Sequence, residues 1–369
     1  MLRIMRSAGL AATALLWAST SISQTREADA AAFGTREGVT NMNLSPDGRL
    51  AVFVGPGPGR SSIVTLVDIA AGSTKRILKA SGEPERLRWC EFASNSRLVC
   101  RFYAMVQGGG TLLPMTRTIS FNLDGTDVKG LGQRASSFDL GYRQSDGTVL
   151  DWLPGGSGEI LMTRLFVPEG QRDAPTNVTR TKEGVGVVRV DTRTLKSVEV
   201  EPPRRQVDSF LTDGRGNVRV QGVAEVTGTG QLTGRTKYQY RTRGNREWRD
   251  LEPFQDGDFV PLAVDADLDA LYALRRKEGR YALVRTSLTT DPAESLVASH
   301  PKVDIDNVVR SANGQKVVGY TLAEERRQTI YFDPAAKALV SSLHRALPKL
   351  AHIELVDASD DGTKVLVYG

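Results

Sequence analysis

The sequence predicts an all-β protein, a β-propeller of seven blades whose last blade is incomplete. A pair of hairpins recurs along the chain with a period of about 45 to 50 residues, the range of four-stranded blades. Turn-forming pairs such as Asp-Gly lie between the two strands of most first hairpins, and no amphipathic helix is expected beyond the N-terminus. Six copies are complete, whereas the seventh begins near residue 353 and contains only its first hairpin. The alternative is a six-bladed ring with the last hairpin packed on its outside.

The first hairpin of each copy reads as two apolar strands around an acidic or Asn-containing turn. Residues 44–54 are the clearest example, because Ser45-Pro46-Asp47-Gly48 precedes a strand of apolar residues. Asp-Gly and Asn-Gly tolerate the positive φ of tight hairpin turns, and the β-branched and aromatic residues around them favour a half-buried pleated surface. The comparable segments are residues 88–100, 142–152, 210–220, 262–274, 308–320 and 355–368.

The second hairpin of each copy reads as an apolar strand, an Asp or Asn, a turn and a more polar strand. Residues 64–74 show it best, and the third copy is longer because the polar residues 168–183 are inserted. One four-stranded blade cannot bury both of its faces, so blades stack around an axis, and ring closure protects the edges. The further second hairpins are residues 118–125, 187–191, 238–248, 281–296 and 329–333.

The N-terminus reads as an export signal. Arg3 and Arg6 precede a short apolar stretch, residues 9–17, which is too short to span a bilayer comfortably. We therefore expect a signal peptide over residues 1–23, with cleavage as late as residue 30, and a propeller domain over residues 33–369. The periplasm or the exterior is the expected location. The alternative is an uncleaved membrane anchor.

The charge of the chain argues against nucleic acid as a partner. The formal net charge is +5, and removal of Arg3 and Arg6 with the signal peptide lowers it to +3. The basic residues are spread over turns and strands, which is typical of a solvated surface. No other stretch is apolar enough to cross a bilayer, so no membrane contact is expected beyond the signal peptide.

Cys90 and Cys100 are the only cysteines of the chain. They lie on opposite arms of a predicted hairpin whose turn is Ser94-Asn95-Ser96, so the two residues face each other across it. In an oxidising compartment this pair can form a cross-strand disulfide. The alternative is a pair of buried free thiols, because cross-strand geometry is often unfavourable for a disulfide.

The sequence contains no pattern that indicates catalysis, a cofactor or a metal. Residues 155–159, Gly-Gly-Ser-Gly-Glu, have the wrong spacing for a nucleophile elbow and lie in a predicted loop. The histidines His300, His344 and His352 have no converging carboxylate or nucleophile in the sequence around them. The glycine-rich residues 55–61 lack the Lys of a phosphate loop. We therefore expect no catalytic, cofactor-binding or metal-binding residue in this chain.

The pattern as a whole resembles the N-terminal propeller of the prolyl oligopeptidase family of serine peptidases. The segments that carry the resemblance are residues 33–39, 43–48, 67–68, 186–192 and 358–368, and it extends over nearly all of the mature chain. It is most similar to exported bacterial members of the dipeptidyl-aminopeptidase and acylaminoacyl-peptidase kinds. The string Ser45-Pro46-Asp47-Gly48 also occurs in other exported propellers, including the TolB-like group.

The resemblance implies a function in substrate access. In that family the propeller caps a C-terminal α/β-hydrolase domain, which carries the catalytic triad, and the ring admits short peptides only. The sequence ends where the hydrolase domain is expected to follow, so we expect a gating propeller that is inactive by itself, with that domain and peptide substrates as its partners. The alternative is a free-standing periplasmic, TolB-like propeller that binds proteins or ligands through rim loops and is closed by residues 24–38 pairing with the last hairpin.

Overall fold

The computed structural model divides the chain into two compact units, Met1–Val39 and Thr40–Gly369. In the first unit the backbone is helical at residues 28–30 and 32–33, and the predicted signal peptide, residues 1–23, lies outside the described residues. Among the described residues, none of the helices has the length and apolar character that crossing a membrane requires. The structure describes residues 28–30, 32–108, 110–153, 155–170, 179–251, 258–311, 314–350 and 352–369.

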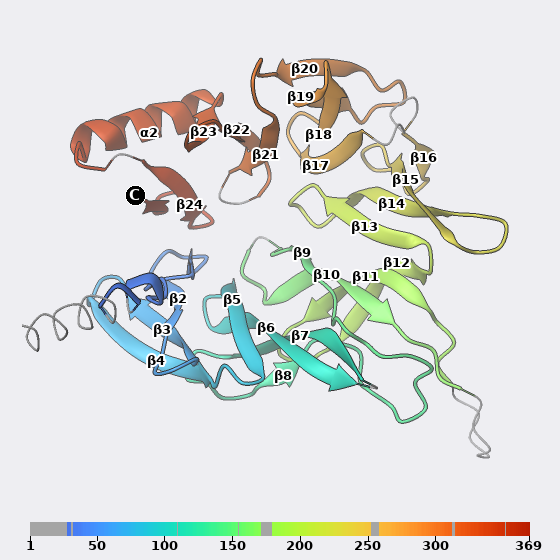
Figure 1. The fold of residues 1–369 in the computed structure, drawn as a ribbon, viewed down its shortest axis with the longest axis horizontal. Coiled ribbons are helices and arrows are strands. Elements are labelled where there is room, and N and C mark those ends of the chain that lie inside the picture. Colours follow the sequence, from blue (N-terminus) through green and yellow to red (C-terminus); the bar gives the residue numbers. More distant parts are fainter. Residues whose placement is uncertain are drawn as a thin grey trace, which may run out of the picture. The chain divides into compact units, whose positions relative to one another are not determined.

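The second unit is a β-propeller, which confirms the predicted fold class (Figure 1). Its sheets are antiparallel and follow one another in chain order, and within each sheet every strand pairs with its neighbours in sequence. The first sheet comprises β1 (Asn41–Leu44), β2 (Leu50–Pro56), β3 (Ser62–Asp68) and β4 (Ser73–Ala80). The second comprises β5 (Glu85–Ser94), β6 (Arg97–Gly108), β7 (Thr111–Asn122) and β8 (Lys129–Gly130). The third comprises β9 (Val149–Asp151), β10 (Glu159–Phe166), β11 (Gly184–Asp191) and β12 (Ser197–Arg204).

The remaining sheets have four, four, three and two strands. The fourth comprises β13 (Val207–Thr212), β14 (Val218–Val226), β15 (Leu232–Tyr240) and β16 (Arg249–Asp250). The fifth comprises β17 (Phe259–Asp265), β18 (Ala270–Lys277), β19 (Arg280–Ser287) and β20 (Glu294–Ala298). The sixth has three strands, β21 (Ile305–Arg310), β22 (Val317–Ala323) and β23 (Arg327–Tyr331), and is followed by helix α2 (Pro334–Ala346). The last sheet is the hairpin of β24 (Glu354–Ala358) and β25 (Val365–Tyr368).

The propeller has six blades of three or four strands, which is the alternative to the seven blades that the repeat predicted. The hairpin β24–β25 is a separate two-stranded sheet, and it contacts both ends of the series of blades. Its residue Asp357 accepts a hydrogen bond from the Leu44 N–H at 2.7 Å, and the Leu355 N–H donates to the Tyr331 hydroxyl at 3.1 Å. The hairpin therefore lies between the sixth sheet and the first and connects the end of the ring to its start.

The turns that the sequence predicted have a common construction. In the turn between β1 and β2, the Ser45 hydroxyl donates to Asp47 at 2.7 Å and accepts from the Leu50 N–H, and Gly48 has φ +66°. The turn between β24 and β25 repeats this arrangement with Ser359 and Asp361. The side-chain bonds hold the tight turn while the glycine adopts the positive φ that other residues avoid.

Apolar side chains fill the space between successive sheets. One buried cluster lies between the first and second sheets and includes Val52, Leu98 and Phe121. Comparable clusters lie between each later pair, down to the one that joins Val318 and Tyr331 of the sixth sheet to α2. This burial is the main stabilising contribution to the ring, at about 25 cal/mol for each Å² of apolar surface removed from water.

Helix α2 shows that the prediction of no helix beyond the N-terminus was wrong. The Asp333 carboxylate accepts a hydrogen bond from the Ala336 N–H at 2.9 Å and caps the helix, and Pro334 begins it. Ala336 and Val340 are buried one helical turn apart. The repeat predicts that Asp333 ends a strand and begins a turn, whereas its side chain begins a helix at the position where the other blades have a fourth strand.

Candidate functional site: the central cavity

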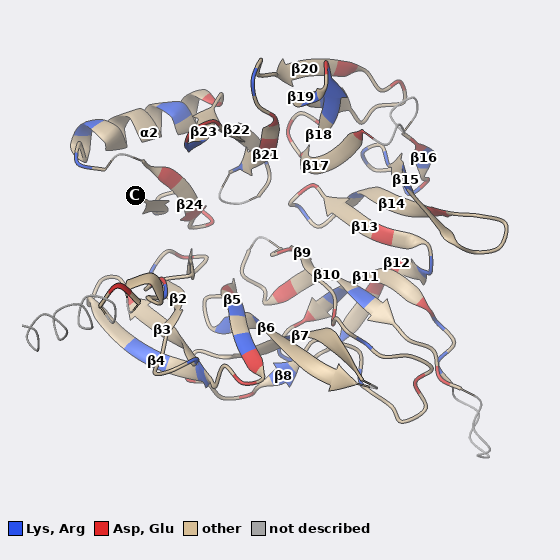
Figure 2. Ribbon diagram, in the orientation of Figure 1, with Lys and Arg blue, Asp and Glu red and all other residues tan. Residues whose placement is uncertain are grey.

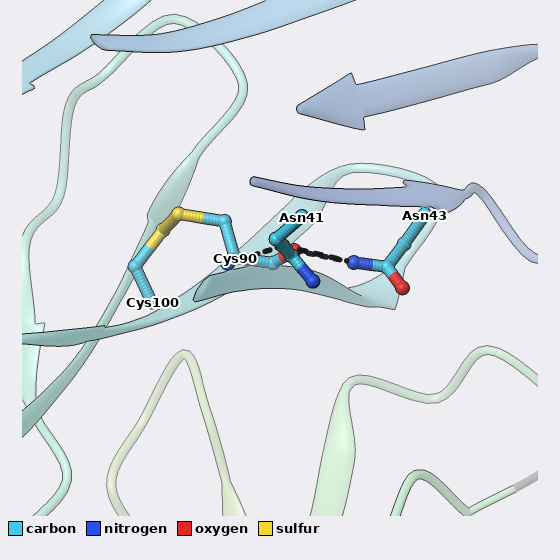
Figure 3. Close-up of a disulfide and its surroundings, with 4 residues drawn as sticks. All are labelled: Asn41, Asn43, Cys90 and Cys100. Carbon is cyan, nitrogen blue, oxygen red and sulfur yellow. Dashed lines mark hydrogen bonds between the residues drawn. A yellow bond between two sulfur atoms is a disulfide. The ribbon is translucent and has the colours of Figure 1, made fainter. Parts of the chain in front are cut away.

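Cys90 and Cys100 are joined by a disulfide in the structure (Figure 3). They are directly opposite each other in the register of β5 and β6, and both are fully buried. The Cys90 backbone is bound on both sides by the first sheet, because its N–H donates to the Asn41 side chain at 3.0 Å and its carbonyl accepts from the Asn43 amide at 2.8 Å. The disulfide therefore lies where the second sheet is fixed to the first.

The first strands of five of the sheets border a cavity of about 750 Å³, within the range of small-molecule sites. Strands β1, β5, β9, β21 and β24 contribute most of its wall. At one end, turns that follow the first strands of several sheets approach each other. The Gly155 N–H donates to the Asp360 carboxylate at 3.4 Å, and a Cβ on Gly214 would lie 2.8 Å from the Gly314 carbonyl oxygen. That glycine therefore permits the turns of the fourth and sixth sheets to meet.

The wall of the cavity carries an excess of acidic groups. Most of them have partners within the protein. The Glu354 carboxylate accepts from the Thr329 hydroxyl at 2.8 Å, and Arg327 donates to Asp306 at 2.9 Å. Figure 2 marks acidic positions on β9 and β24. The ionisable residues of the wall are Glu91, Asp151, Glu354, Asp357, Asp360, Arg310 and Arg327.

Asp151 and Asp357 connect neighbouring sheets through the backbone. Asp151 accepts from the Gly216 N–H at 2.6 Å, and Asp357 accepts from the N–H groups of Leu44 and Ala358 at 2.7 and 2.8 Å. Burial raises the pKa of each carboxyl group, while these hydrogen bonds act in the opposite direction. Both residues thus hold the ring together in addition to lining the cavity.

Glu91 differs from the other acidic residues of the wall. It follows Cys90 on β5 and is half-buried, yet among the described residues its carboxyl group has neither a hydrogen bond nor an ion pair. Burial, with a smaller contribution from the charge of Asp357, raises the pKa of Glu91 to about 7. Its charge therefore changes near neutral pH, which is typical of functional positions.

Arg310 is the basic counterpart of Glu91. It lies at the end of β21, and its guanidinium group makes no hydrogen bond or ion pair with the part of the chain that the structure describes. Burial lowers its pKa, and the charge of Asp151 acts against this. The cavity thus contains one acidic and one basic side chain that no described residue satisfies, a combination suited to binding a charged ligand.

Trp152 adds an aromatic surface to the cavity, next to β9. Its ring meets that of Trp89 edge to face, with centroids 6.0 Å apart and an interplanar angle of 87°. Such pairs restrict ring rotation and leave the exposed part of the ring available for a ligand.

Ser157 and the three histidines were the candidates for chemistry in the sequence. They lie outside the cavity wall or make ordinary hydrogen bonds and ion pairs. The Ser157 hydroxyl accepts from the Glu159 N–H at 3.2 Å, and His300 Nδ1 accepts from the Lys302 and Val303 N–H groups at 3.3 Å. His344 lies on α2, and His352 is beside Glu354, with 3.8 Å between Nε2 and the carboxylate. Within the described residues, no group of three or more His, Cys, Asp or Glu side chains is placed to hold a metal ion.

Sequence reasoning missed Glu91 and Arg310. The signal that was present is a charged residue inside an otherwise apolar first strand, as in Trp89-Cys90-Glu91-Phe92 and Val308-Val309-Arg310. The sequence does not say that these two strands, far apart in the chain, border the same cavity.

No protein-family model matches this chain, and no curated protein matches its sequence. Several solved structures are similar in fold. The acylaminoacyl peptidase of Pyrococcus horikoshii is 13% identical, with a TM-score of 0.39 over 87% of this chain and 48% of that one. The chain thus spans about half the length of that peptidase.

Two further structures illustrate the range of similar proteins. An oligogalacturonate lyase of Vibrio parahaemolyticus is 9% identical, with a TM-score of 0.45 over 80% of this chain and 77% of that one. The β-propeller domain of the Trilobed protease of Pyrococcus furiosus is 15% identical, with a TM-score of 0.38 over 81% of this chain and 83% of that one. Similarity at this level decides nothing about function, since propellers carry many unrelated activities.

Proposed function

We propose that this chain is the propeller portion of an exported serine peptidase of the prolyl oligopeptidase kind and that it admits short peptides to a catalytic domain outside these residues. The central cavity is the observation that carries the proposal. Its volume of about 750 Å³ suits a few residues of extended chain and is far too small for a folded protein. The resemblance of the repeat, especially residues 43–48 and 358–368, supports the choice of family.

The proposal includes the absence of catalysis by this chain alone. Peptide hydrolysis by a serine peptidase needs a hydroxyl group beside a base and an oxyanion site. Ser157, which lies in the string nearest to the elbow pattern, has the Glu159 N–H as its partner rather than a histidine. The purified mature chain is therefore expected to leave aminoacyl and dipeptidyl p-nitroanilides uncleaved. Activity that follows this chain through successive purification steps would contradict this part of the proposal.

Peptide admission is tested by closing the cavity. Val356 lines the cavity and is 47% exposed, so Val356→Trp fills space at little expense in folding. Val198 on β12 is 67% exposed and lies outside the cavity wall, so Val198→Trp is the matched control. We expect isothermal titration to show binding of tetra-alanine by the wild type and the control, loss of binding in Val356→Trp, and no binding of folded lysozyme. If the two variants bound tetra-alanine equally, the cavity would not be the place where peptides are admitted.

Export is the second part of the proposal. The basic and apolar residues of positions 1–17 support a cleaved signal, and the disulfide between Cys90 and Cys100 suits an oxidising compartment. N-terminal sequencing of the protein recovered from a periplasmic fraction should give a start after residue 23 or as late as residue 31. Recovery of the uncleaved chain from membranes would instead support the alternative, in which the N-terminus is an uncleaved membrane anchor.

A free-standing propeller remains the second candidate, because one observation favours it. The last hairpin already contacts the first sheet, through the Leu44 N–H on Asp357 and the Asp360 N–H on the Pro46 carbonyl at 2.8 Å. Of residues 24–38, which were expected to pair with the last hairpin, the described residues 28–30 and 32–38 form no strand. Sequencing the coding DNA beyond the codon for Gly369 separates the two candidates, because only the peptidase requires a hydrolase domain in the same frame.

A further inference from the structure

We infer that the outer part of the β6–β7 hairpin, residues 102–116, binds the surface of an anionic phospholipid membrane. We call these residues the apolar hairpin. They belong to the second sheet and not to the wall of the central cavity, so the inference does not depend on the proposed function. The sequence predicted no membrane contact beyond the signal peptide because no other stretch can cross a bilayer, whereas a segment that lies in the membrane surface needs no such stretch.

The apolar hairpin contains no charged residue, although 25% of the whole chain is charged. Its described part is accordingly tan in Figure 2. The corresponding tips of the fifth and sixth sheets are charged, with Lys-Glu-Gly-Arg at residues 277–280 and Glu-Glu-Arg at residues 324–326. Charged side chains are the usual residues of a hairpin tip that projects into water. The second sheet therefore departs from the pattern of its own repeat.

The apolar hairpin extends beyond the other strands of its sheet. In the described part of the chain, residues 105–108 pair only with residues 111–114, because β5 and β8 stop before them. Val106 lies opposite Leu113, and Leu112, which is 63% exposed, points to the other face of the hairpin. Both faces of the tip thus present apolar side chains to solvent, an arrangement that is typical of interaction sites.

The apolar surface continues on the segment beside β7. The Gln144 carbonyl accepts a hydrogen bond from the Thr116 N–H at 2.7 Å, which places this segment next to the apolar hairpin. Leu140 and Tyr142 of the segment are exposed, whereas the side chain of Asp139 is mostly buried and forms ion pairs within the protein. Apolar groups outside and a charge inside reverse the usual order of a surface loop. Tyrosine is enriched where proteins meet the polar layer of a membrane.

Arginines surround the base of the apolar hairpin. Arg117 lies opposite Phe102, and Arg86 lies opposite Tyr103. The Arg88 guanidinium lies 5.6 Å from the centre of the Tyr103 ring. All three arginines are exposed at the base, where the exposed acidic residue is the one at position 85. The base therefore carries three positive charges against one negative charge.

The order of apolar tip and basic base indicates the partner. In an anionic bilayer the phosphate groups lie outside the hydrocarbon, so an inserted tip brings the arginines to the level of the phosphates. A purely apolar protein surface would use the tip but not the arginines. A second copy of this chain would bring the same arginines together across a twofold axis, which like-charge repulsion disfavours. An anionic membrane is the partner that satisfies both parts.

The test is co-sedimentation of the chain from residue 24 onwards with large lipid vesicles. Residues 1–23 are omitted because the apolar residues 9–17 can bind lipid themselves, and the propeller unit begins only at Thr40. We expect binding to vesicles of equal parts phosphatidylglycerol and phosphatidylcholine to be at least about tenfold tighter than to phosphatidylcholine alone. Raising the salt concentration from about 0.1 M to about 0.5 M should weaken the binding to the anionic vesicles.

Substitutions separate the tip from the base. Leu112→Glu puts a charge on the exposed tip and should weaken binding to the anionic vesicles about tenfold or more. Leu232 is 72% exposed in the corresponding hairpin of the fourth sheet, so Leu232→Glu should bind like the wild type. Arg86→Gln combined with Arg88→Gln should weaken binding to anionic vesicles about tenfold and leave binding to phosphatidylcholine unchanged. Circular dichroism establishes that each variant is folded, and these side chains are exposed in the structure.

Three results would overturn the inference. If Leu112→Glu and Leu232→Glu sedimented equally, a surface other than the apolar hairpin would bind the lipid. If the wild type bound both kinds of vesicle equally, the arginines would have no part in recognition and the partner would not be an anionic membrane.

The third result is failure of the wild type to sediment with either kind of vesicle. If its mass in analytical ultracentrifugation then rose with concentration, and Leu112→Glu abolished that rise, the apolar hairpin would instead join two copies of the chain. None of these results bears on the proposed function, because binding of tetra-alanine in the central cavity is measured separately.

Discussion

Replacing Glu91 with Gln should make the protein more stable at pH 8 and leave its stability unchanged at pH 4. Gln is neutral and nearly the same shape as a protonated Glu, so the two proteins are matched where the carboxyl group carries its proton. Above that range only the wild type holds an ionised carboxylate that lacks a partner among the described residues. The difference between the wild type and the variant in the pH dependence of the free energy of unfolding isolates this one group, because the other acidic residues are common to both proteins.

The magnitude follows from the pKa of Glu91. Its ordinary value is 4.5, and in the folded protein it is about 7. Between these values the folded state keeps a proton that the unfolded state has lost, so the free energy of unfolding falls as the pH rises. At about 1.4 kcal/mol per pH unit the full loss is about 3 kcal/mol, and access of water to the cavity reduces it to about 1–3 kcal/mol.

The assay is urea unfolding of the wild type and Glu91→Gln, followed by tryptophan fluorescence at pH 4, 5, 6, 7 and 8. We expect the stability difference to be near zero at pH 4, to grow between pH 5 and 7, and to level off by pH 8 in favour of Gln. Glu85→Gln provides the control for a Glu replacement on the same strand at an exposed position. A difference that stays constant over the series, or a Gln variant that is less stable at pH 8, would refute the reasoning.

Three further changes test the packing of the ring by the same unfolding assay. Replacing Cys90 and Cys100 with Ala should cost about 2–3 kcal/mol, and dithiothreitol should produce the same loss in the wild type and none in the variant. Asp265→Ala should cost at least about 2 kcal/mol, because the carboxylate is buried and accepts the Val317 N–H of the next sheet at 3.0 Å; Asp208→Ala, at an exposed position, should be nearly neutral. Asp333→Ala should cost about 1 kcal/mol through loss of the α2 cap, and an unchanged stability would show that the helix does not need it.

The repeat could be recognised in the sequence because each hairpin forms from residues that are close together in the chain. The Asp-Gly turn at Asp47-Gly48 forms from bonds within a few residues, between the Ser45 hydroxyl and the Asp47 carboxylate and between that carboxylate and the Arg49 N–H. Such turns, together with alternating apolar residues, establish strand order and blade boundaries without any long-range information. The facing positions of Cys90 and Cys100 follow from the same local register.

Helix α2 could not be predicted from local patterns in the same way. Asp333-Pro334 is a good helix start, but Asp also ends strands throughout this repeat, and the sequence pattern favoured a continuing sheet. The outcome depends on tertiary packing, because Ala336 and Val340 are buried against Val318 and Tyr331 of the sixth sheet. This local sequence pattern is compatible with a strand and with a helix, and the chain adopts the conformation that buries its apolar face.

The sequence by itself determined the fold class, the repeat and the absence of a recognisable catalytic motif. Only the tertiary structure decided how the ring ends, through the contacts of Asp357 with the first sheet, and which side chains share the central cavity. Glu91 and Arg310 are 219 residues apart in the chain and become neighbours of one cavity only when the blades close. The physical reason is that turns and strand alternation are encoded locally, whereas burial, charge and unsatisfied bonding depend on what the rest of the chain places around each residue.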